Sequence, residues 1–314
     1  MTAAAVGVAL ALDAVAGEPP TRLHPVAWFG RVVAPLDRSW SRPRLVGALA
    51  TATLPLGAAL TVGALVGVAA LQRPLAGAVA GGIALFVTTS LRRLLVVGRG
   101  VTAASETDID AAREQLRALA GRDASALSAG EVRSAVVESV AENLADGLVA
   151  PLGAFAVLAV AGARIGPAAG PGVDPAVLGI ALGAAGAAWV KAVNTMDSML
   201  GYRSKPVGWA PARLDDAVMW VPARASAVLI AAAFLAPRSL ANARRWLDAV
   251  PSPNSGWPMG TVAAALNVRL VKPGVYELDG GPALPSVADA ERAVRRVGVA
   301  GGLAYLAAGV VTWG

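Results

Sequence analysis

The sequence predicts an all-α fold, that of a polytopic helical integral membrane protein with cytoplasm-facing polar loops and helices. The chain of 314 residues is 56% hydrophobic and only 15% charged, and its mean hydropathy is +0.59. That value is too apolar for an ordinary soluble enzyme. Two runs without a charged residue, 45–72 and 74–91, are each long enough to cross about 30 Å of hydrocarbon as a helix.

The apolar runs, taken in order, predict six membrane spans in a single helical membrane domain, 1–314. The spans lie near residues 2–16, 46–72, 74–97, 147–163, 175–193 and 297–313. The first is short, but it lacks the basic start of a secretory signal, so we expect a retained helix and not a cleaved leader. A further apolar run, 225–237, is too short to span and is expected to be re-entrant or buried in protein.

The polar segments between the spans carry most of the Arg residues. They are 17–44, 98–146, 194–224 and 238–296. Because pairs of spans return the chain to the same side, we expect these segments to gather on one face, and their Arg content makes it the cytoplasmic face of the cell membrane. The net charge of +6 is then explained by topology and by anionic lipid or phosphate, and not by nucleic acid.

Glycines four residues apart in several spans predict close approach of helix backbones. The pairs are Gly63/Gly67, Gly77/Gly81, Gly179/Gly183 and Gly298/Gly302. A chain with 35 glycines also produces such pairs by chance.

Several kinds of site are excluded by composition and motif. The chain has no cysteine and one histidine, His24, so neither a thiolate nor a His-rich metal site can form. It also contains no Walker loop, no G-x-S-x-G elbow and no dinucleotide fingerprint. The remaining polar segments are typical of a cytoplasm-facing membrane site for Mg²⁺ and an anionic ligand.

The stretch ESVAENLADG, residues 138–147, places Glu138, Glu142 and Asp146 on one helical stripe. Like charges at this spacing repel by roughly 0.2–0.5 kcal/mol per pair. A divalent cation reverses the sign of that interaction, and carboxylates with an amide oxygen, here that of Asn143, are ligands that Mg²⁺ prefers. The alternative is a solvated helix face that pairs with the many Arg residues.

The segment 191–216 continues directly from an apolar span and carries polar side chains on one helix face, namely Lys191, Asn194, Asp197 and Ser198. Polar groups at that depth usually face a cavity or a partner. Glycines and prolines at 201–211 then break the helix, with Arg203 and Lys205 in the break as phosphate binders. Arg213, Asp215 and Asp216 follow, and the alternative for the whole segment is a juxtamembrane loop of ordinary salt bridges.

Two further segments combine turn residues with polar and aromatic side chains. PSPNSGWPMG, 251–260, holds Asn254, Ser255 and Trp257, and is too rich in turn residues to be helical. It is either an anion-binding turn or a loop anchored by Trp at the lipid interface. GEPPTRLHPVAWFGR, 17–31, holds Arg22 and His24, of which the histidine is either a base or, more simply, structural.

Together and in this order, these four segments resemble one family, the adenosylcobinamide-phosphate synthases of cobalamin biosynthesis, also called CobD/CbiB. The similar stretches run from residue 17 to about 276 and include ESVAENLADGLVAPL, NTMDSMLGYRSKPVGWAPARLDD and PSPNSGWP. The resemblance implies ATP-dependent amide formation between a propionate of adenosylcobyric acid and aminopropanol or its O-phosphate. It further implies contact with membrane lipid and with other cobalamin-assembly membrane proteins, and no binding of nucleic acid.

The resemblance also implies roles for the residues above. Mg²⁺ is expected at Glu138, Glu142, Asn143 and Asp146, and the catalytic candidates are Asp215, Asp216, Lys191 and His24. ATP phosphates and substrates are expected at Arg22, Asn194, Asp197, Ser198, Arg203, Lys205, Arg213, Asn254, Ser255 and Trp257. Met259 departs from the family pattern, because an acidic residue often follows the Trp-Pro pair, and this argues against a catalytic acid in that loop.

Two other classes of protein share some of these features. A Mg²⁺-dependent membrane prenyltransferase would require two similar Asp-rich motifs, whereas ESVAENLADG and NTMDS are only loosely alike. A corrinoid or anion transporter would require an access path through the bilayer and gives no reason for polar groups to gather on one face.

Overall fold

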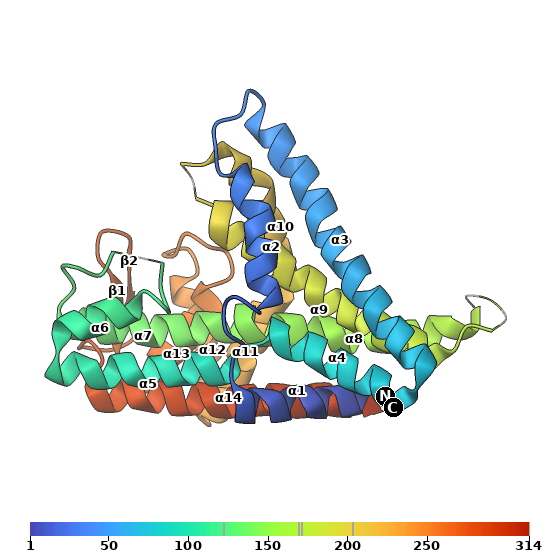
Figure 1. Ribbon diagram of the computed structural model, residues 1–314. Coiled ribbons are helices and arrows are strands. Elements are labelled where there is room, and N and C mark those ends of the chain that lie inside the picture. The colour runs from blue at the N-terminus through green and yellow to red at the C-terminus, as the bar shows by residue number, and fades with distance from the viewer. Residues whose placement is uncertain (122, 169, 171, 203, 314) are drawn as a thin grey trace. The chain divides into compact units, whose positions relative to one another are not determined.

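The computed structural model describes residues 1–121, 123–168, 170, 172–202 and 204–313. Within these residues the protein is helical apart from one two-stranded hairpin, which confirms the all-α, polytopic membrane fold. The chain folds into two units, each assembled from separate stretches of sequence (Figure 1).

Unit 1 comprises residues 1–90, 150–218 and 305–314. Its helices are α1 (Thr2–Ala16), α2 (Pro25–Val33), α3 (Pro43–Gln72), α4 (Pro74–Thr88), α8 (Ala150–Ile165), α9 (Pro175–Leu200) and α10 (Trp209–Val218), with short 3-10 turns η1 (Ala34–Leu36), η3 (Gly166–Ala168) and η4 (Pro206–Gly208). In this unit α9 packs against both α8 and α3, and α1 packs against α4.

Small residues permit the close packing of these helices, as three of the four predicted glycine pairs indicate. A Cβ at Gly183 would lie 2.9 Å from the carbonyl oxygen of Phe155 on α8, and one at Gly63 would lie 3.1 Å from that of Ala181 on α9. In the fourth pair, Gly298/Gly302, only Gly298 lies at a close contact, since a Cβ at Gly302 would meet nothing within 4 Å.

Unit 2 comprises residues 91–149 and 219–304. Its elements are α5 (Leu91–Thr107), α6 (Ile109–Leu116), α7 (Ala129–Leu144), the π-helical turn η2 (Ala145–Val149), α11 (Trp220–Ala233), α12 (Arg238–Ala243), the 3-10 turn η5 (Arg244–Trp246), α13 (Gly256–Leu266), β1 (Arg269–Lys272), β2 (Tyr276–Asp279) and most of α14 (Val287–Trp313). Helix α7 packs against α5, α13 and β1.

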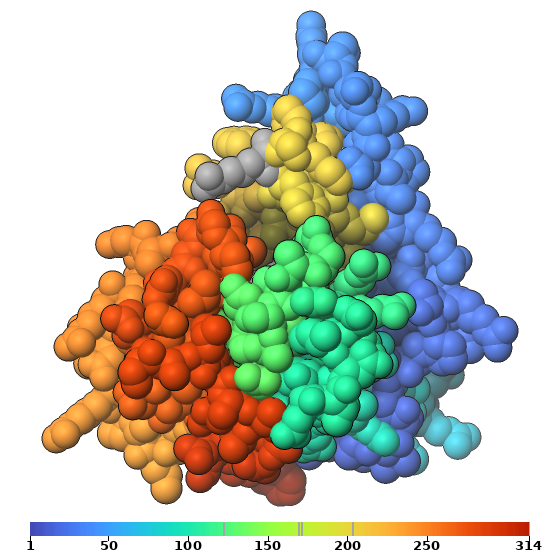
Figure 2. All heavy atoms as spheres, turned by 90° about the vertical axis from the view of Figure 1, so that its left-hand side faces the viewer, coloured from blue at the N-terminus to red at the C-terminus, as the bar shows by residue number. Residues whose placement is uncertain are grey.

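Helix α7 begins at a capping box and is buried along most of its length. The Ser128 hydroxyl accepts from the Glu131 backbone N–H, and the Glu131 carboxylate accepts from the Ser128 backbone N–H in return, which satisfies two otherwise unpaired donors. In the space-filling view of the whole molecule, the green segment that leads into α7 lies beside the orange-red segment that follows the hairpin (Figure 2). Within unit 2, the Arg133 side chain donates a hydrogen bond to the Pro285 carbonyl oxygen at 2.7 Å.

Within the described residues, five helical stretches are long and apolar enough to cross a membrane, and a bent pair is a sixth candidate. The five are Pro43–Gln72, Pro74–Thr107, Ala129–Ala168, Pro175–Leu200 and Val287–Trp313. The predicted spans at 46–72, 74–97, 147–163, 175–193 and 297–313 fall within them. The pair Pro206–Val218 and Trp220–Ala233, bent by 46°, contains most of the expected re-entrant run, whereas the predicted first span is the shorter apolar helix α1.

Two local expectations are corrected by the structure. The segment 251–260 was expected to be non-helical, but α13 begins at Gly256, because Pro258 falls in the first helical turn, where its missing N–H is not needed. The hairpin β1–β2 was not expected in the polar segment 238–296, since strands of four residues leave little periodicity to detect.

Candidate functional site

Unit 2 holds a polar cavity of about 200 Å³, called here the unit 2 cavity. It is lined by Leu119, Ala120, Gly121, Ser139, Glu142, Asn143, Asp146 and Lys272. Helix α7 and the π-helical turn η2 supply four of these side chains, and the end of β1 supplies Lys272. Two of the predicted metal-binding carboxylates, Glu142 and Asp146, are therefore brought to one cavity, together with the predicted amide of Asn143.

The third predicted carboxylate, Glu138, lies elsewhere. It is 0% exposed, and its two oxygens accept hydrogen bonds from Ser134 Oγ at 2.8 Å and from the Tyr276 hydroxyl at 2.7 Å. It is not among the residues that line the unit 2 cavity. Residues of a common helical stripe thus have different partners, because β1 and β2 pack on the N-terminal part of the stripe and the cavity lies beyond them.

The unit 2 cavity suits a cation that is shared with another ligand. Among the described residues, no three His, Cys, Asp or Glu side chains lie close enough together to hold a metal ion alone. Mg²⁺, however, commonly uses one or two carboxylates and completes its shell with water and substrate phosphates. The Asn143 amide nitrogen donates to the Ser139 carbonyl oxygen at 2.9 Å, so the ligand that Asn143 can offer a cation is Oδ1.

The cavity wall changes helix type at Asp146. Helix α7 ends at Leu144, and Ala145–Val149 forms a π-helical turn before α8. Such turns insert one residue into a helix and are frequent at functional sites. The turn moves Asp146 away from the position that a continuous α-helix would give it relative to Glu142.

In unit 1, four polar side chains of α9 and α10 form an acidic cluster, defined here as Asn194, Asp197, Asp215 and Asp216. The Asp215 side chain is hydrogen-bonded with Asn194 and lies within range of the charges of Asp197 and Asp216. Asp215 is only 9% exposed, and its Oδ1 has no hydrogen-bond partner among the described residues. A buried carboxylate oxygen without a partner is costly, which is typical of a group that receives a ligand or a proton.

Lys191 and His24 lie at the border of the acidic cluster. The charge of Lys191 acts on both Asp215 and His24. The His24 imidazole caps α2, because its Nδ1 accepts a hydrogen bond from the Val26 backbone N–H at 3.2 Å. Burial lowers the pKa of His24 below its ordinary value of 6.5, and the charge of Lys191 acts in the same direction while Glu18 opposes both. The neutral tautomer therefore carries its proton on Nε2, and this capping role leaves Nδ1 poorly placed to act as a base.

The remaining predicted phosphate binders of unit 1 are dispersed. Lys205 Nζ forms an ion pair with Asp37 at 2.7 Å and donates to the Met199 carbonyl oxygen at 3.2 Å. Ser198 donates to the Asn194 carbonyl oxygen, and Arg213 is exposed near Asp216. Arg22 is exposed as well, and Arg203 lies outside the described residues.

The predicted loop residues of unit 2 are organised by Arg224, which the sequence did not single out. Its guanidinium lies 4.0 Å from the ring centroid of Trp220 and 5.3 Å from that of Trp257, and it donates to Asn254 Oδ1 at 3.4 Å. Ser255 is buried beside Asn254. The cation–π contacts make this segment a packed structural element, without a cavity of its own among those described.

The family model described as CobD/Cbib protein matches residues 6–300, which is nearly the whole chain. This chain belongs to the CobD/CbiB family. The similar stretches identified in the sequence all lie within the matched residues.

Relatives of the CobD/CbiB family cover most of this chain. A probable cobalamin biosynthesis protein CobD of Methanothrix thermoacetophila is 37% identical over 315 residues, which cover 95% of this chain and 93% of the relative. The cobalamin biosynthesis protein CobD of Mycobacterium tuberculosis is 40% identical over 92% of this chain and 90% of the relative. The cobalamin biosynthesis protein CobD of Rhodobacter capsulatus is 33% identical over 87% of this chain and 83% of the relative. No solved structure matches the chain.

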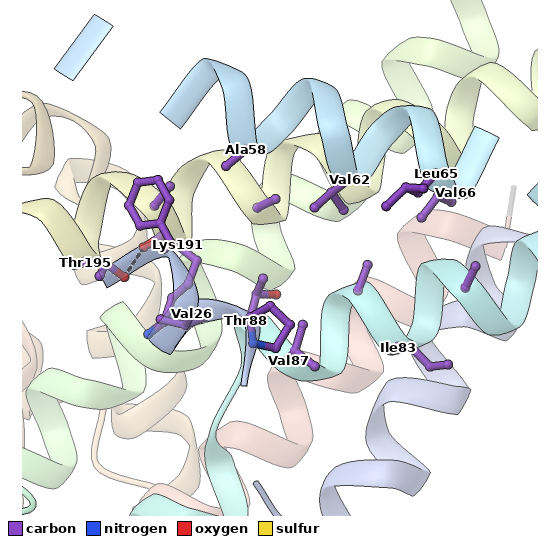
Figure 3. Close-up of a pocket in the computed structure, with 16 residues that line it drawn as sticks. Val26, Ala58, Val62, Leu65, Val66, Ile83, Val87, Thr88, Lys191 and Thr195 are labelled. Atoms are coloured by element: carbon purple, nitrogen blue, oxygen red, sulfur yellow. Dashed lines mark hydrogen bonds between the residues drawn. The ribbon is translucent and has the colours of Figure 1, made fainter. Parts of the chain in front are cut away.

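This CobD/CbiB-family protein also has an apolar groove of about 360 Å³ in unit 1, between α2, α3, α4 and α9. Figure 3 shows Lys191, Thr195 and Val26 at one end of it and Leu65, Val66 and Ile83 at the other. Its wall is almost wholly apolar, so the groove suits a hydrocarbon chain and not a nucleotide.

Sequence reasoning about this CobD/CbiB-family protein missed three residues that shape the unit 2 site, namely Lys272, Tyr276 and Ser134. Lys272 lines the cavity, and the other two hold the hairpin on α7. The hairpin could have been found from the stretch VRLVKPGVYEL, in which apolar and polar residues alternate on both sides of a Pro-Gly turn.

Proposed function

We propose that this protein acts in cobalamin biosynthesis as an acid–amine ligase, an adenosylcobinamide-phosphate synthase. It would use ATP to join aminopropanol or its O-phosphate to a propionate of adenosylcobyric acid, giving adenosylcobinamide or its phosphate. Family membership supports the pathway. The observation that carries the reaction type is the unit 2 cavity, which gathers Glu142, Asp146 and Lys272 in a space suited to a metal-bound polyphosphate.

In this proposal the unit 2 cavity binds the nucleotide. Glu142, Asp146 and Asn143 Oδ1 would hold Mg²⁺, whose chemistry when bound is to neutralise the charge of the triphosphate. In ATP-driven ligation the corrinoid carboxylate attacks the γ-phosphorus and ADP leaves. The amine nitrogen then attacks the acyl carbon, and inorganic phosphate leaves. The enzyme's part in such a reaction is chiefly to position groups and to stabilise charge.

The amine must lose a proton when it forms the amide, and we propose that Asp215 or Asp216 of the acidic cluster accepts it. Asp215 is the stronger candidate, because its buried Oδ1 has no hydrogen-bond partner within the described part of the chain. Asp197 and Asn194 would orient the amine through their side chains, and Lys191 would take a phosphate oxygen. His24 is assigned to capping α2 and not to catalysis.

We also propose that the protein lies in the cell membrane with its active face in the cytoplasm, where ATP and corrinoid intermediates are available. The Arg-rich polar segments support this orientation.

The test is mass spectrometry of the detergent-purified protein after incubation with adenosylcobyric acid, Mg-ATP and aminopropanol, with and without its O-phosphate. A corrinoid that gains the mass of the amine minus water, while nucleotide is consumed, is the expected result, and the preferred amine identifies itself. Intact corrinoid and nucleotide, from protein shown to be folded, would contradict the ligase and favour a corrinoid or anion transporter. A Mg²⁺-dependent prenyltransferase would instead consume a prenyl pyrophosphate.

A further inference from the structure

Glu138 belongs to a buried hydrogen-bond network that joins α7 to both strands of the hairpin. Ser134 Oγ donates to Glu138 Oε1 at 2.8 Å, and it accepts from the backbone N–H of Val271 on β1 at 2.7 Å. On β2, the Tyr276 hydroxyl donates to Glu138 Oε2 at 2.7 Å. One carboxylate and one hydroxyl thus fix the position of the hairpin relative to α7.

The register of the hairpin determines which way Lys272 points. Lys272 pairs with Tyr276 across the two strands, and Leu270 pairs with Leu278. Directly paired residues of antiparallel strands project from the same face of a sheet. Since Tyr276 reaches Glu138 and both leucines are fully buried, this is the face turned toward α7.

The turn between the strands is tight, so Lys272 has a defined starting point. The Val275 backbone N–H donates to the Lys272 carbonyl oxygen at 2.9 Å, and Gly274 has a φ of 72°, which favours glycine. From this position the Lys272 side chain lines the unit 2 cavity with Glu142 and Asp146. A lysine ammonium in such surroundings is a point charge suited to a phosphate oxygen.

We infer that Lys272 binds the phosphates of a metal-bound nucleoside polyphosphate in the unit 2 cavity, and that Ser134, Glu138 and Tyr276 are the positioning residues that place it there. Glu138 then acts on the hairpin and not as a metal ligand. This inference rests on the proposed use of ATP and names the residues that recognise its phosphates.

The first experiment uses an ATP acyl phosphate probe, which transfers its acyl group to a lysine amine close to the bound phosphates. The chain has only three lysines, Lys191, Lys205 and Lys272, so peptide mass spectrometry of the labelled full-length protein distinguishes them. Labelling is expected at Lys272 and should fall about tenfold with excess Mg-ATP, while Lys205, which is ion-paired with Asp37, serves as the internal control.

The outcomes separate this inference from the proposed function. Labelling of Lys191 or Lys205 that Mg-ATP suppresses, without labelling of Lys272, would overturn the inference and leave ATP use intact. Labelling that Mg-ATP suppresses at none of the three lysines, in protein that forms the amide from ATP, would also overturn the inference. The same absence in protein without ligase activity would overturn both.

The second experiment tests positioning through two conservative substitutions. Tyr276→Phe keeps the ring and removes the hydroxyl, so the KM for ATP should rise about tenfold with little change in kcat, and labelling of Lys272 should fall. Glu138→Gln should leave the Mg²⁺ requirement within about twofold, because a Gln amide can hydrogen-bond with both hydroxyls. Tyr202→Phe, at an exposed tyrosine of unit 1, is the matched control.

A Mg²⁺ requirement raised by Glu138→Gln as strongly as by Glu142→Gln would make Glu138 a metal ligand and overturn its positioning role. An unchanged KM for ATP in the Tyr276→Phe protein would overturn the positioning role of Tyr276.

Discussion

Glu142 and Asp146 line the unit 2 cavity, whereas Glu138 is bound by Ser134 and Tyr276, and this difference leads to a prediction about Mg²⁺. Glu142→Gln and Asp146→Asn should each lower the apparent affinity for Mg²⁺ by at least the roughly 10- to 100-fold that loss of a supporting contact costs in metal sites. The measurement is amide formation as a function of Mg²⁺ concentration at saturating ATP. Asp110→Asn, at a side chain 86% exposed, is the control and should behave as the unaltered protein. Unchanged Mg²⁺-dependent turnover in the Glu142→Gln protein would exclude that carboxylate as a ligand.

His24 is the only histidine in the chain, and it supports a pH prediction. Burial lowers its pKa below 6.5, so the folded protein favours the neutral imidazole. Stability from this group is therefore present above pH 6.5 and is lost as the pH falls. With ¹³C-labelled histidine, a single imidazole resonance should titrate with a midpoint below 6.5. A midpoint above 6.5 would contradict both the burial of the imidazole and its cap on α2.

At the residue scale, the sequence shows which side chains could bind a ligand better than it shows which residues they contact. The spacing of Glu142 and Asp146 predicts a shared position, and both line one cavity. Spacing alone cannot show that Glu138 has a different role from these two carboxylates, because its partner Tyr276 lies 138 residues further along the chain. Lys272 is hidden for the same reason, since only the pairing of the hairpin with α7 brings it to the cavity.

At the scale of elements, the contact of α3 with η4 depends on a glycine. A Cβ at Gly47 would overlap the carbonyl oxygen of Val207, whereas a Cβ at Gly57 of the same helix meets nothing within 4 Å. Gly47→Ala should therefore destabilise unit 1 by about 1–3 kcal/mol. Gly57→Ala should be neutral or stabilise the protein by up to about 1 kcal/mol. Thermal unfolding of both variants in one detergent provides the comparison, and equal midpoints would show that α3 shifts to accommodate the added methyl group.

Long apolar helices are the elements that the sequence predicts best, because uncharged runs of span length have few other structures available to them. The elements that it predicts poorly are short ones fixed by tertiary contacts. The strands β1 and β2 have four residues each and are held on α7 by Ser134 and Glu138. Helix α13 begins within a turn-rich segment because it packs against α11 and α12.

At the scale of the whole molecule, the Arg-rich segments predict how the protein lies in the membrane. The chain contains no cysteine, so single cysteines can be introduced without background. Asp110→Cys lies in the predicted cytoplasmic segment 98–146, and Val173→Cys, at a residue 37% exposed, lies in the turn between α8 and α9. A membrane-impermeant maleimide should label the Val173→Cys protein in intact cells, and the Asp110→Cys protein only after permeabilisation.

The reverse pattern of labelling would invert the orientation. Labelling of both variants in intact cells would place both positions outside, and the stretch between them, which contains α8, would then not cross the membrane once as the sequence predicts.

The contact between Thr2 and Thr312 bears on how the protein is made. The Thr2 hydroxyl donates to the carbonyl oxygen of Thr312 at 3.0 Å across 310 positions of sequence, and both units draw on early and late stretches of the chain. During synthesis, α1 leaves the ribosome long before α14, so this contact can form only once the stretch between them has been made. Unit 1 can therefore be completed only after unit 2, whose last residue is 304, although unit 1 holds the earlier part of the chain. A chain that stops before residue 305 would leave unit 1 without its last segment, and one that stops before residue 219 would also lack the second stretch of unit 2.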